Sequence, residues 1–129
     1  MALSTKINKI KELSKISPVL ALGIPLEKFE DSTIIEANAP SEHFGIINMA
    51  KGLKAPSWFY GIVKGNKSHQ IIINNIDLID KESQEKFYEL LKYKAISDVE
   101  LPADCTIIVL ASDLKKVSET ILRLCLLVE

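Results

Sequence analysis

The sequence predicts a three-layer α/β domain in which helices cover both faces of a mostly parallel β-sheet. Two segments of strand length carry this prediction, residues 70–75 with the run Ile71-Ile72-Ile73 and the apolar residues 105–111. A strand that is apolar throughout is buried on both faces, as strands are in parallel sheets. Such buried strands alternate with helical patterns along the chain, so parallel pairing with helices on both faces is expected.

Length and composition fit one globular domain over residues 1–129. The chain is 47% hydrophobic and 26% charged, which is enough for a single core. Its 16 basic and 17 acidic residues leave a net charge of −1, so strong attraction to nucleic acid or to an anionic membrane is not expected. No apolar run approaches the roughly 20 residues of a membrane span. We expect a cytoplasmic protein in which Cys105 and Cys125 are buried thiols.

The first third of the chain contains one clear helical pattern. Apolar residues recur every three positions over residues 4–16, which predicts a helix with a lysine-rich outer face. The apolar positions are Ile7, Ile10, Leu13 and Ile16. Residues 19–22 allow either a helix or a strand, because Ser17 and Pro18 can begin a helix or open a strand. The other elements expected before residue 65 are a strand at 33–37, a short helix at 42–49 and a helix that opens at 54–60.

In the second half of the chain, the strand at 70–75 is followed by a helix at 81–93. Asp80 is its predicted N-cap, with Ser83 at the third helical position. The apolar side chains that this helix would bury are Phe87, Leu90 and Leu91. The remaining expected elements are a hairpin-like excursion at 97–104, a strand at 105–111, a short helix at 118–124 and a last strand at 126–128.

The order of these segments resembles the AAA+ ATPase core, most closely its MoxR-like members and, near residue 120, clamp-loader subunits. The resemblance covers about residues 18–129, with residues 4–16 as an additional helix, and it rests on an ordered series of segments. The series is Asn38-Ala39-Pro40, Phe44-Gly45, Ala55-Pro56-Ser57-Trp58, Ile71-Ile72-Ile73-Asn74-Asn75-Ile76-Asp77, the helix with Gln84, Asp98-Val99-Glu100-Leu101-Pro102, Ala111-Ser112-Asp113 and Val117 to Leu122. It implies a P-loop NTPase fold.

Within that family, the positions of Asn74 and Asn75 hold the Walker B acids that bind Mg²⁺ and activate water. Asparagine has no charge, so it neither anchors Mg²⁺ strongly nor accepts a proton near neutral pH. The family's sensor asparagine is replaced by Ser112. Its arginine finger falls at Leu124, with Arg123 one place early. The resemblance therefore implies the scaffold of an ATPase without its chemistry.

No segment matches the Gly-rich phosphate-binding loop, Walker A, that such an ATPase needs. The string Gly65-Asn66-Lys67-Ser68 has an extra residue and leads into a strand rather than a helix. Where the family has its loop, only Gly23 and Lys28 remain, and Glu27 would repel phosphate. Residues 21–25 resemble the end of the helix that follows such a loop, so we expect the loop and its strand to be missing. No helical lid domain is expected after residue 128, and no cofactor.

Several other residues are weaker candidates. Asp77 is the remaining acid near the Walker B positions and is a weak metal candidate. An Asp that ends a strand and begins the turn into a helix is the commoner role. His43 and His69 have no second ligand at metal spacing and are expected in surface loops. The aromatic cluster Trp58, Phe59 and Tyr60 is expected in the core, with a partner-binding patch as the alternative.

Three functions remain open. We favour a catalytically inactive AAA+-like domain, not an enzyme, that binds another protein: an active AAA+ subunit or a second copy. Its candidate contact residues are Trp58, Phe59, Tyr60, Leu124 and Leu126. The second function is binding of ATP with Mg²⁺ at a site that another chain completes. The third is an unrelated small α/β binding domain, for which the strand order would differ from that of an AAA+ core.

Overall fold

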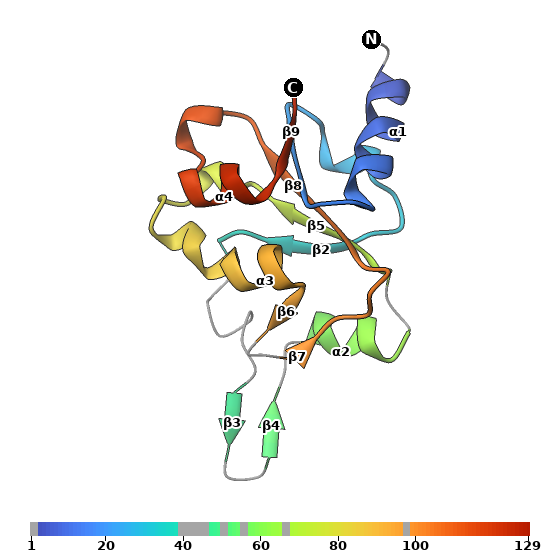
Figure 1. Cartoon of the computed structure of the whole chain (residues 1–129), viewed down its shortest axis with the longest axis vertical. Helices are drawn as coiled ribbons and strands as arrows, with labels where there is room; N and C mark the ends of the chain where they lie inside the picture. Colours follow the sequence, from blue (N-terminus) through green and yellow to red (C-terminus); the bar gives the residue numbers. More distant parts are fainter. Residues whose placement is uncertain (1–2, 39–46, 50–51, 55–56, 66–67, 97–98) are drawn as a thin grey trace.

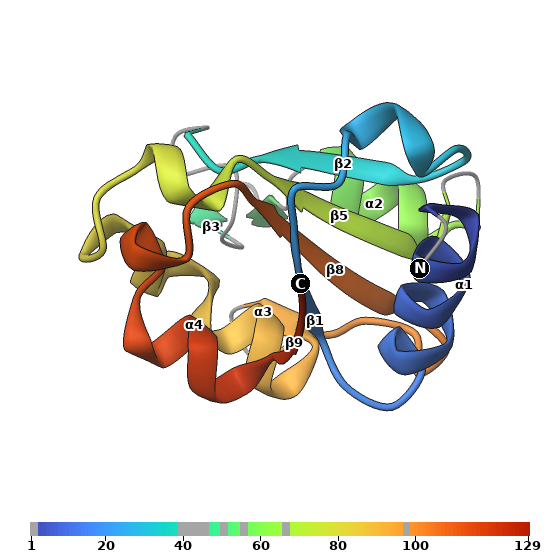
Figure 2. The ribbon, with the colours of Figure 1, turned by 90° about the horizontal axis from the view of Figure 1, so that it is seen from above.

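A computed structural model describes residues 3–38, 47–49, 52–54, 57–65, 68–96 and 99–129 (Figure 1). At its centre is a five-stranded sheet in which all four pairings are parallel. Its strands, in spatial order, are β2 (Thr33–Glu36), β5 (Gln70–Asn74), β8 (Thr106–Ala111), β1 (Val19–Leu22) and β9 (Leu126–Val128). Figure 2 shows this order from above. The predicted parallel sheet is confirmed.

The two strands that led to the prediction lie side by side inside the sheet. β5 pairs with β8 so that Ile72 lies opposite Ile108. Both isoleucines are fully buried, as are Ile71 and Ile73. Because both faces of these strands are covered, each face requires apolar side chains, and the alternation expected of a half-exposed strand is lost.

Helices cover both faces of the sheet, which makes three layers. On one face lie α2 (Ser57–Val63), α3 (Tyr88–Tyr93) and α4 (Glu119–Leu124). On the other lie α1 (Leu3–Ser14) and a 3-10 turn, Leu26–Lys28. Successive residues of β5 point to opposite sides. Ile71 and Ile73 therefore belong to the larger core under α2, α3 and α4, and Ile72 to the smaller core under α1.

The first helix begins and ends earlier than expected. α1 ends at Ser14, whose hydroxyl donates a hydrogen bond to the carbonyl of Lys11 at 2.7 Å. Ile7 and Ile10 are buried as predicted, but Ile16 lies beyond the helix and is 80% exposed. The expectation that Ile16 belongs to the buried stripe is wrong, because the chain leaves the helix there to enter β1.

The helix expected at 81–93 consists of two parts, a 3-10 helix at Ser83–Phe87 and then α3. Its predicted cap is present, since Asp80 Oδ1 accepts the backbone N–H of Ser83 at 2.7 Å. That hydrogen bond lowers the pKa of Asp80 below its usual value. Lys94, in the left-handed region at φ 52°, ends α3. The helix expected at 118–124 begins with a buried N-cap, Ser118.

Residues 19–22 are a strand, which decides between the two alternatives that the sequence left open. β1 pairs with both β8 and β9, and its Val19, Leu20 and Ala21 are fully inaccessible to solvent. Pairing on both edges satisfies every backbone polar group of such a segment, which a short buried helix here would not do. Residues 21–25 are accordingly the end of a strand and the start of a loop, not the end of a helix.

Two short antiparallel ribbons lie outside the main sheet. The excursion expected at 97–104 is a small hairpin that begins earlier, with β6 (Ala95–Ile96) paired to β7 (Val99–Glu100). The other ribbon pairs β3 (Ile47–Met49) with β4 (Gly52–Lys54), so the short helix expected at 42–49 is wrong for residues 47–49. Pairing with β4 determines the conformation there, and residues 42–46 lie outside the described part of the chain. Across the described ranges, none of the helices has both the length and the apolar character that crossing a membrane requires.

Candidate functional site

A hollow of about 260 Å³ lies at the carboxyl ends of the central strands. Within the strand order, the chain leaves β1 in the direction of β2, at one edge of the sheet. It leaves β8 in the opposite direction, towards β9 at the other edge. Such a change of direction is where open parallel sheets bind ligands. The lining residues are Ile24, Pro25, Leu26, Asn74, Asn75, Leu110, Ala111 and Ser112. The structure thus brings together Asn74, Asn75 and Ser112, three residues singled out from the sequence.

The polar groups at the end of β5 are paired with a carboxylate. Asn74 Nδ2 donates to Glu36 Oε1 at 2.9 Å and to Oε2 at 3.3 Å, and Asn75 Nδ2 lies 3.5 Å from Oε2. Glu36 and Asn74 face each other across the β2–β5 pairing. Asn75 has a left-handed backbone at φ 62°, which asparagine tolerates better than most residues. These amides therefore act as donors to Glu36, a role that an Asp or Glu near neutral pH cannot fill.

Asp77 is buried and connects two strand ends. Its Oδ2 accepts the backbone N–H groups of Ser112 at 3.0 Å and of Asp113 at 2.9 Å. These bonds hold the turn after β5 against the end of β8. They also occupy the carboxylate that the sequence offered as a weak metal candidate, so the structure favours the structural role.

The connection after β1 differs from a phosphate-binding loop. Gly23 has φ 70° and donates its N–H to the carbonyl of Ala111 at 2.9 Å, so that donor is already used. The described residues 23–32 contain a single 3-10 turn, Leu26–Lys28, and no α-helix whose N-terminus could face a phosphate. In the other string considered, Gly65 closes α2 and Ser68 precedes β5, while residues 66–67 lie outside the described chain.

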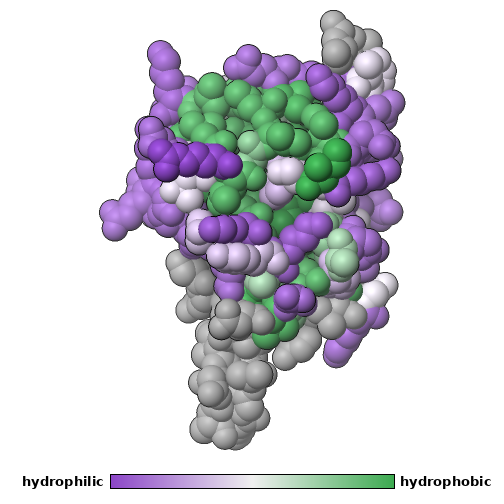
Figure 3. All heavy atoms as spheres, in the orientation of Figure 1, coloured by the Kyte–Doolittle hydropathy of each residue, from purple (hydrophilic) through white to green (hydrophobic). Residues whose placement is uncertain are grey.

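The proposed contact residues have different surroundings. Trp58 and Phe59 are 8% and 4% exposed, with ring centroids 6.1 Å apart in an edge-to-face pair, so burial makes them core residues rather than surface contacts. The side chain of Tyr60 lies outside the described part. Leu124 packs partly against the larger core, whereas Leu126 and its neighbour Leu127 are 39% and 45% exposed. Figure 3 shows hydrophobic side chains gathered on the face where β9 and α4 lie.

At the opposite end of the sheet, the structure brings His69 close to Asp104 and Cys105. The sequence offers His69 no second ligand at metal spacing, but β5 and β8 pair in parallel, so residues 35 positions apart meet at the amino ends of these strands. Local spacing gave no sign of this cluster; only the strand pairing could have. Burial, and next the charge of Asp104, raise the pKa of the Cys105 thiol to about 11. His43 lies outside the described residues.

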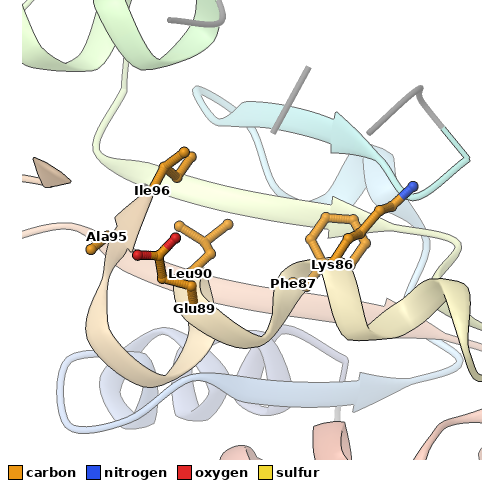
Figure 4. A pocket seen from close by; sticks show the side chains of 6 residues that line it. All are labelled: Lys86, Phe87, Glu89, Leu90, Ala95 and Ile96. Carbon is orange, nitrogen blue, oxygen red and sulfur yellow. The ribbon is translucent and has the colours of Figure 1, made fainter. Parts of the chain in front are cut away.

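A second hollow, between the segment around Phe87 and β6, is too small for a ligand (Figure 4). Its volume is about 10 Å³, close to the least that holds one water molecule. It is lined by Lys86, Phe87, Glu89, Leu90, Ala95 and Ile96. We therefore regard it as a packing defect of the larger core.

Comparison with known proteins gives no matching family model and no matching curated relative.

Proposed function

We propose that this chain is a catalytically inactive AAA+-like domain that acts as a protein-interaction or assembly subunit. The observation that carries the proposal is the chemistry at the carboxyl ends of the central strands. Asn74 and Asn75 stand where acids would bind Mg²⁺, and they donate to Glu36 instead. The connection from β1 contains no α-helix in residues 23–32. This combination retains the framework of a nucleotide-hydrolysing site and lacks its working parts.

The strand order supports the AAA+ part of the proposal. Along the chain, the strands of the main sheet are β1, β2, β5, β8 and β9, and across the sheet they lie in the order second, third, fourth, first, fifth. Two strands, β5 and β8, separate the first strand from the second, as in the AAA+ core that the sequence resembles. The order also brings Asn74 and Ser112, the residues compared with the family's Walker B and sensor positions, to the ends of adjacent strands, β5 and β8.

Electrostatics at the hollow favour a non-nucleotide role. A triphosphate needs several backbone N–H donors and cations around it. Instead, Glu36 lies beside Asn74, and Asp77 holds the backbone N–H groups of Ser112 and Asp113. A fixed carboxylate without a metal repels phosphate, and donors that are already bonded are lost to a ligand.

The face of β9 offers the surface for a partner. β9 pairs with β1 on one side, and the described residues place no strand on its other side. Its backbone groups and the exposed Leu126 and Leu127 therefore form an edge that another chain can extend. Scattered exposed leucines are common, but Leu127 lies on the face of the sheet that α4 covers with its partly buried Leu122 and Leu124, whereas Leu126 points to the other face.

The hollow itself favours a second candidate function, nucleotide binding completed by another chain. Its position at the switch point of a parallel sheet is the usual one for a ligand. Calorimetric titration with ATP and ADP, with and without Mg²⁺, separates the two functions. The interaction proposal expects no heat up to about 1 mM nucleotide. Binding tighter than about 100 µM would replace it with the second function.

Photo-crosslinking tests the interaction surface directly. A photo-reactive amino acid introduced at position 127, in β9, should form a covalent adduct with one defined partner or with a second copy of the chain. The same amino acid at position 78 is the control, because Leu78 is 71% exposed and lies outside β9. Equal adducts from both positions, or none from position 127, would contradict the proposed surface.

A further inference from the structure

His69, Asp104 and Cys105 lie together at the amino ends of the two central strands. His69 immediately precedes β5 and Cys105 immediately precedes β8. The backbone N–H of Thr106 donates to the carbonyl of His69 at 2.9 Å, which continues the pairing of the two strands. The backbones that carry these side chains are therefore held by the most buried part of the sheet, as a preorganised binding site requires.

One ligating atom from each residue lies within 4.8 Å of those of the other two. His69 Nδ1 and Asp104 Oδ1 are 2.8 Å apart. The side chains of His69 and Asp104 are 32% and 74% exposed, whereas Cys105 is buried. The cluster is thus open to solvent at the carboxylate and imidazole, with the sulfur beneath them.

Two kinds of chemistry use a cysteine, a histidine and an aspartate: nucleophilic catalysis and metal binding. A catalytic thiol must reach a substrate atom, and the burial of Cys105 prevents this. A metal ion is small enough to sit between the exposed imidazole and carboxylate and touch the sulfur from there. The geometry therefore favours a metal.

We propose that His69, Asp104 and Cys105 bind a divalent transition-metal ion, and that Zn²⁺ is the ion this donor set fits best. Imidazole nitrogen, carboxylate oxygen and thiolate sulfur are the three donor types of zinc sites. Three protein ligands leave a fourth tetrahedral position for water. Around Zn²⁺ such atoms lie roughly 3.2–3.6 Å apart, so the nitrogen and oxygen separate slightly and the sulfur moves inward. This site is at the opposite end of the sheet from the hollow and does not depend on the proposed function.

Substitution of Lys94 provides an electrostatic test of the proposed metal site. The Lys94 ammonium lies 3.4 Å from the carbonyl of Ala103, next to Asp104, and its charge acts on Cys105. A cation beside the site opposes binding of a second cation. Lys94→Met should therefore tighten binding of Zn²⁺ severalfold.

The experiment is calorimetric titration of chelator-treated, reduced protein with Zn²⁺ alone. One ion per chain should bind, and His69→Gln, Asp104→Asn and Cys105→Ser should each weaken binding at least about tenfold. Cys125→Ser is the matched control, because that half-buried thiol lies in another part of the fold and should leave the affinity unchanged. With Co²⁺ as the probe, a thiolate-to-metal charge-transfer band should appear in the wild type and disappear in Cys105→Ser.

If the buried Cys105→Ser variant does not fold, the variants of the two exposed ligands, His69 and Asp104, still decide the test. His69→Gln and Asp104→Asn alter partly or largely exposed side chains, so they should fold normally. Absence of binding up to about 1 mM Zn²⁺ overturns the proposal. It is equally overturned if the folded His69→Gln variant binds as tightly as the wild type, since binding is then adventitious.

Discussion

At the scale of single residues, one buried side chain connects two loops. Gln84 is fully buried, and its Nε2 donates to the carbonyls of Ile79 at 3.1 Å and Lys116 at 2.7 Å. Its Oε1 accepts the N–H of Ser118, the N-cap of α4, at 2.7 Å. A glutamine is long enough to satisfy all three backbone groups at once.

Gln84→Met keeps the size of the side chain and removes its hydrogen bonds. We expect the free energy of unfolding to fall by about 2–4 kcal/mol, because an unsatisfied buried group costs about 1–3 kcal/mol. Urea denaturation measures this change. Gln70→Met is the matched control, since Gln70 is half-buried and its Nε2 donates to Ser32 Oγ, itself near solvent. Equal losses in the two variants would refute the linking role of Gln84.

Local hydrogen bonds could be predicted at this scale and distant ones could not. The Asp80 cap was predicted because its partner, Ser83, is three residues away. The pairing of Glu36 with Asn74 joins residues 38 positions apart. It depends on β2 and β5 being neighbours in register, which no local pattern indicates.

At the scale of elements, α1 provides most of the cover on its face of the sheet. Its Ile7 and Ile10 pack with Ile72 and Ile108 in the smaller core. The three-residue spacing of its apolar side chains predicted this helix, because that spacing places them on one face. The helix end was not predicted, since it depends on where the chain must turn to reach β1.

Truncation of Ile10 tests the role of α1. Ile10→Ala should reduce the free energy of unfolding by about 2–5 kcal/mol, the usual cost for a fully buried aliphatic side chain. Leu3→Ala in the same helix, where the side chain is 41% exposed, should cost under about 1 kcal/mol. Thermal and urea unfolding give both values. A small loss in Ile10→Ala would mean that α1 docks only weakly on the sheet.

At the scale of the whole molecule, the connection from β1 to β2 explains why the hollow lacks a phosphate-binding loop. The ten residues 23–32 cross two strands, β8 and β5, to begin β2 at Thr33. Parallel crossovers usually take a dozen or more residues and include a helix. A connection this short has no residues left for a Gly-rich loop and a helix in addition to the crossing.

Introducing acids at positions 74 and 75, which we compared with Walker B, should therefore not produce ATP hydrolysis. The double variant Asn74→Asp with Asn75→Glu should show no ATP turnover, as measured by phosphate release with Mg²⁺. It should also be less stable, because a carboxylate at position 74 would lie about 3 Å from the Glu36 carboxylate and the two negative charges would repel. Addition of Glu36→Gln should recover up to about 1 kcal/mol of that loss. Mg²⁺-dependent turnover in the double variant would contradict the inactive assignment.

The sequence by itself determined the α/β class, the buried central strands and most helices, because periodicity and apolar runs are local properties. It also determined that asparagines stand at the end of β5. The tertiary structure decided that residues 19–22 are a strand and that His69 meets Asp104 and Cys105. Each of these outcomes depends on which strands are neighbours, and pairing between distant segments is set by the packing of the whole chain rather than by local pattern.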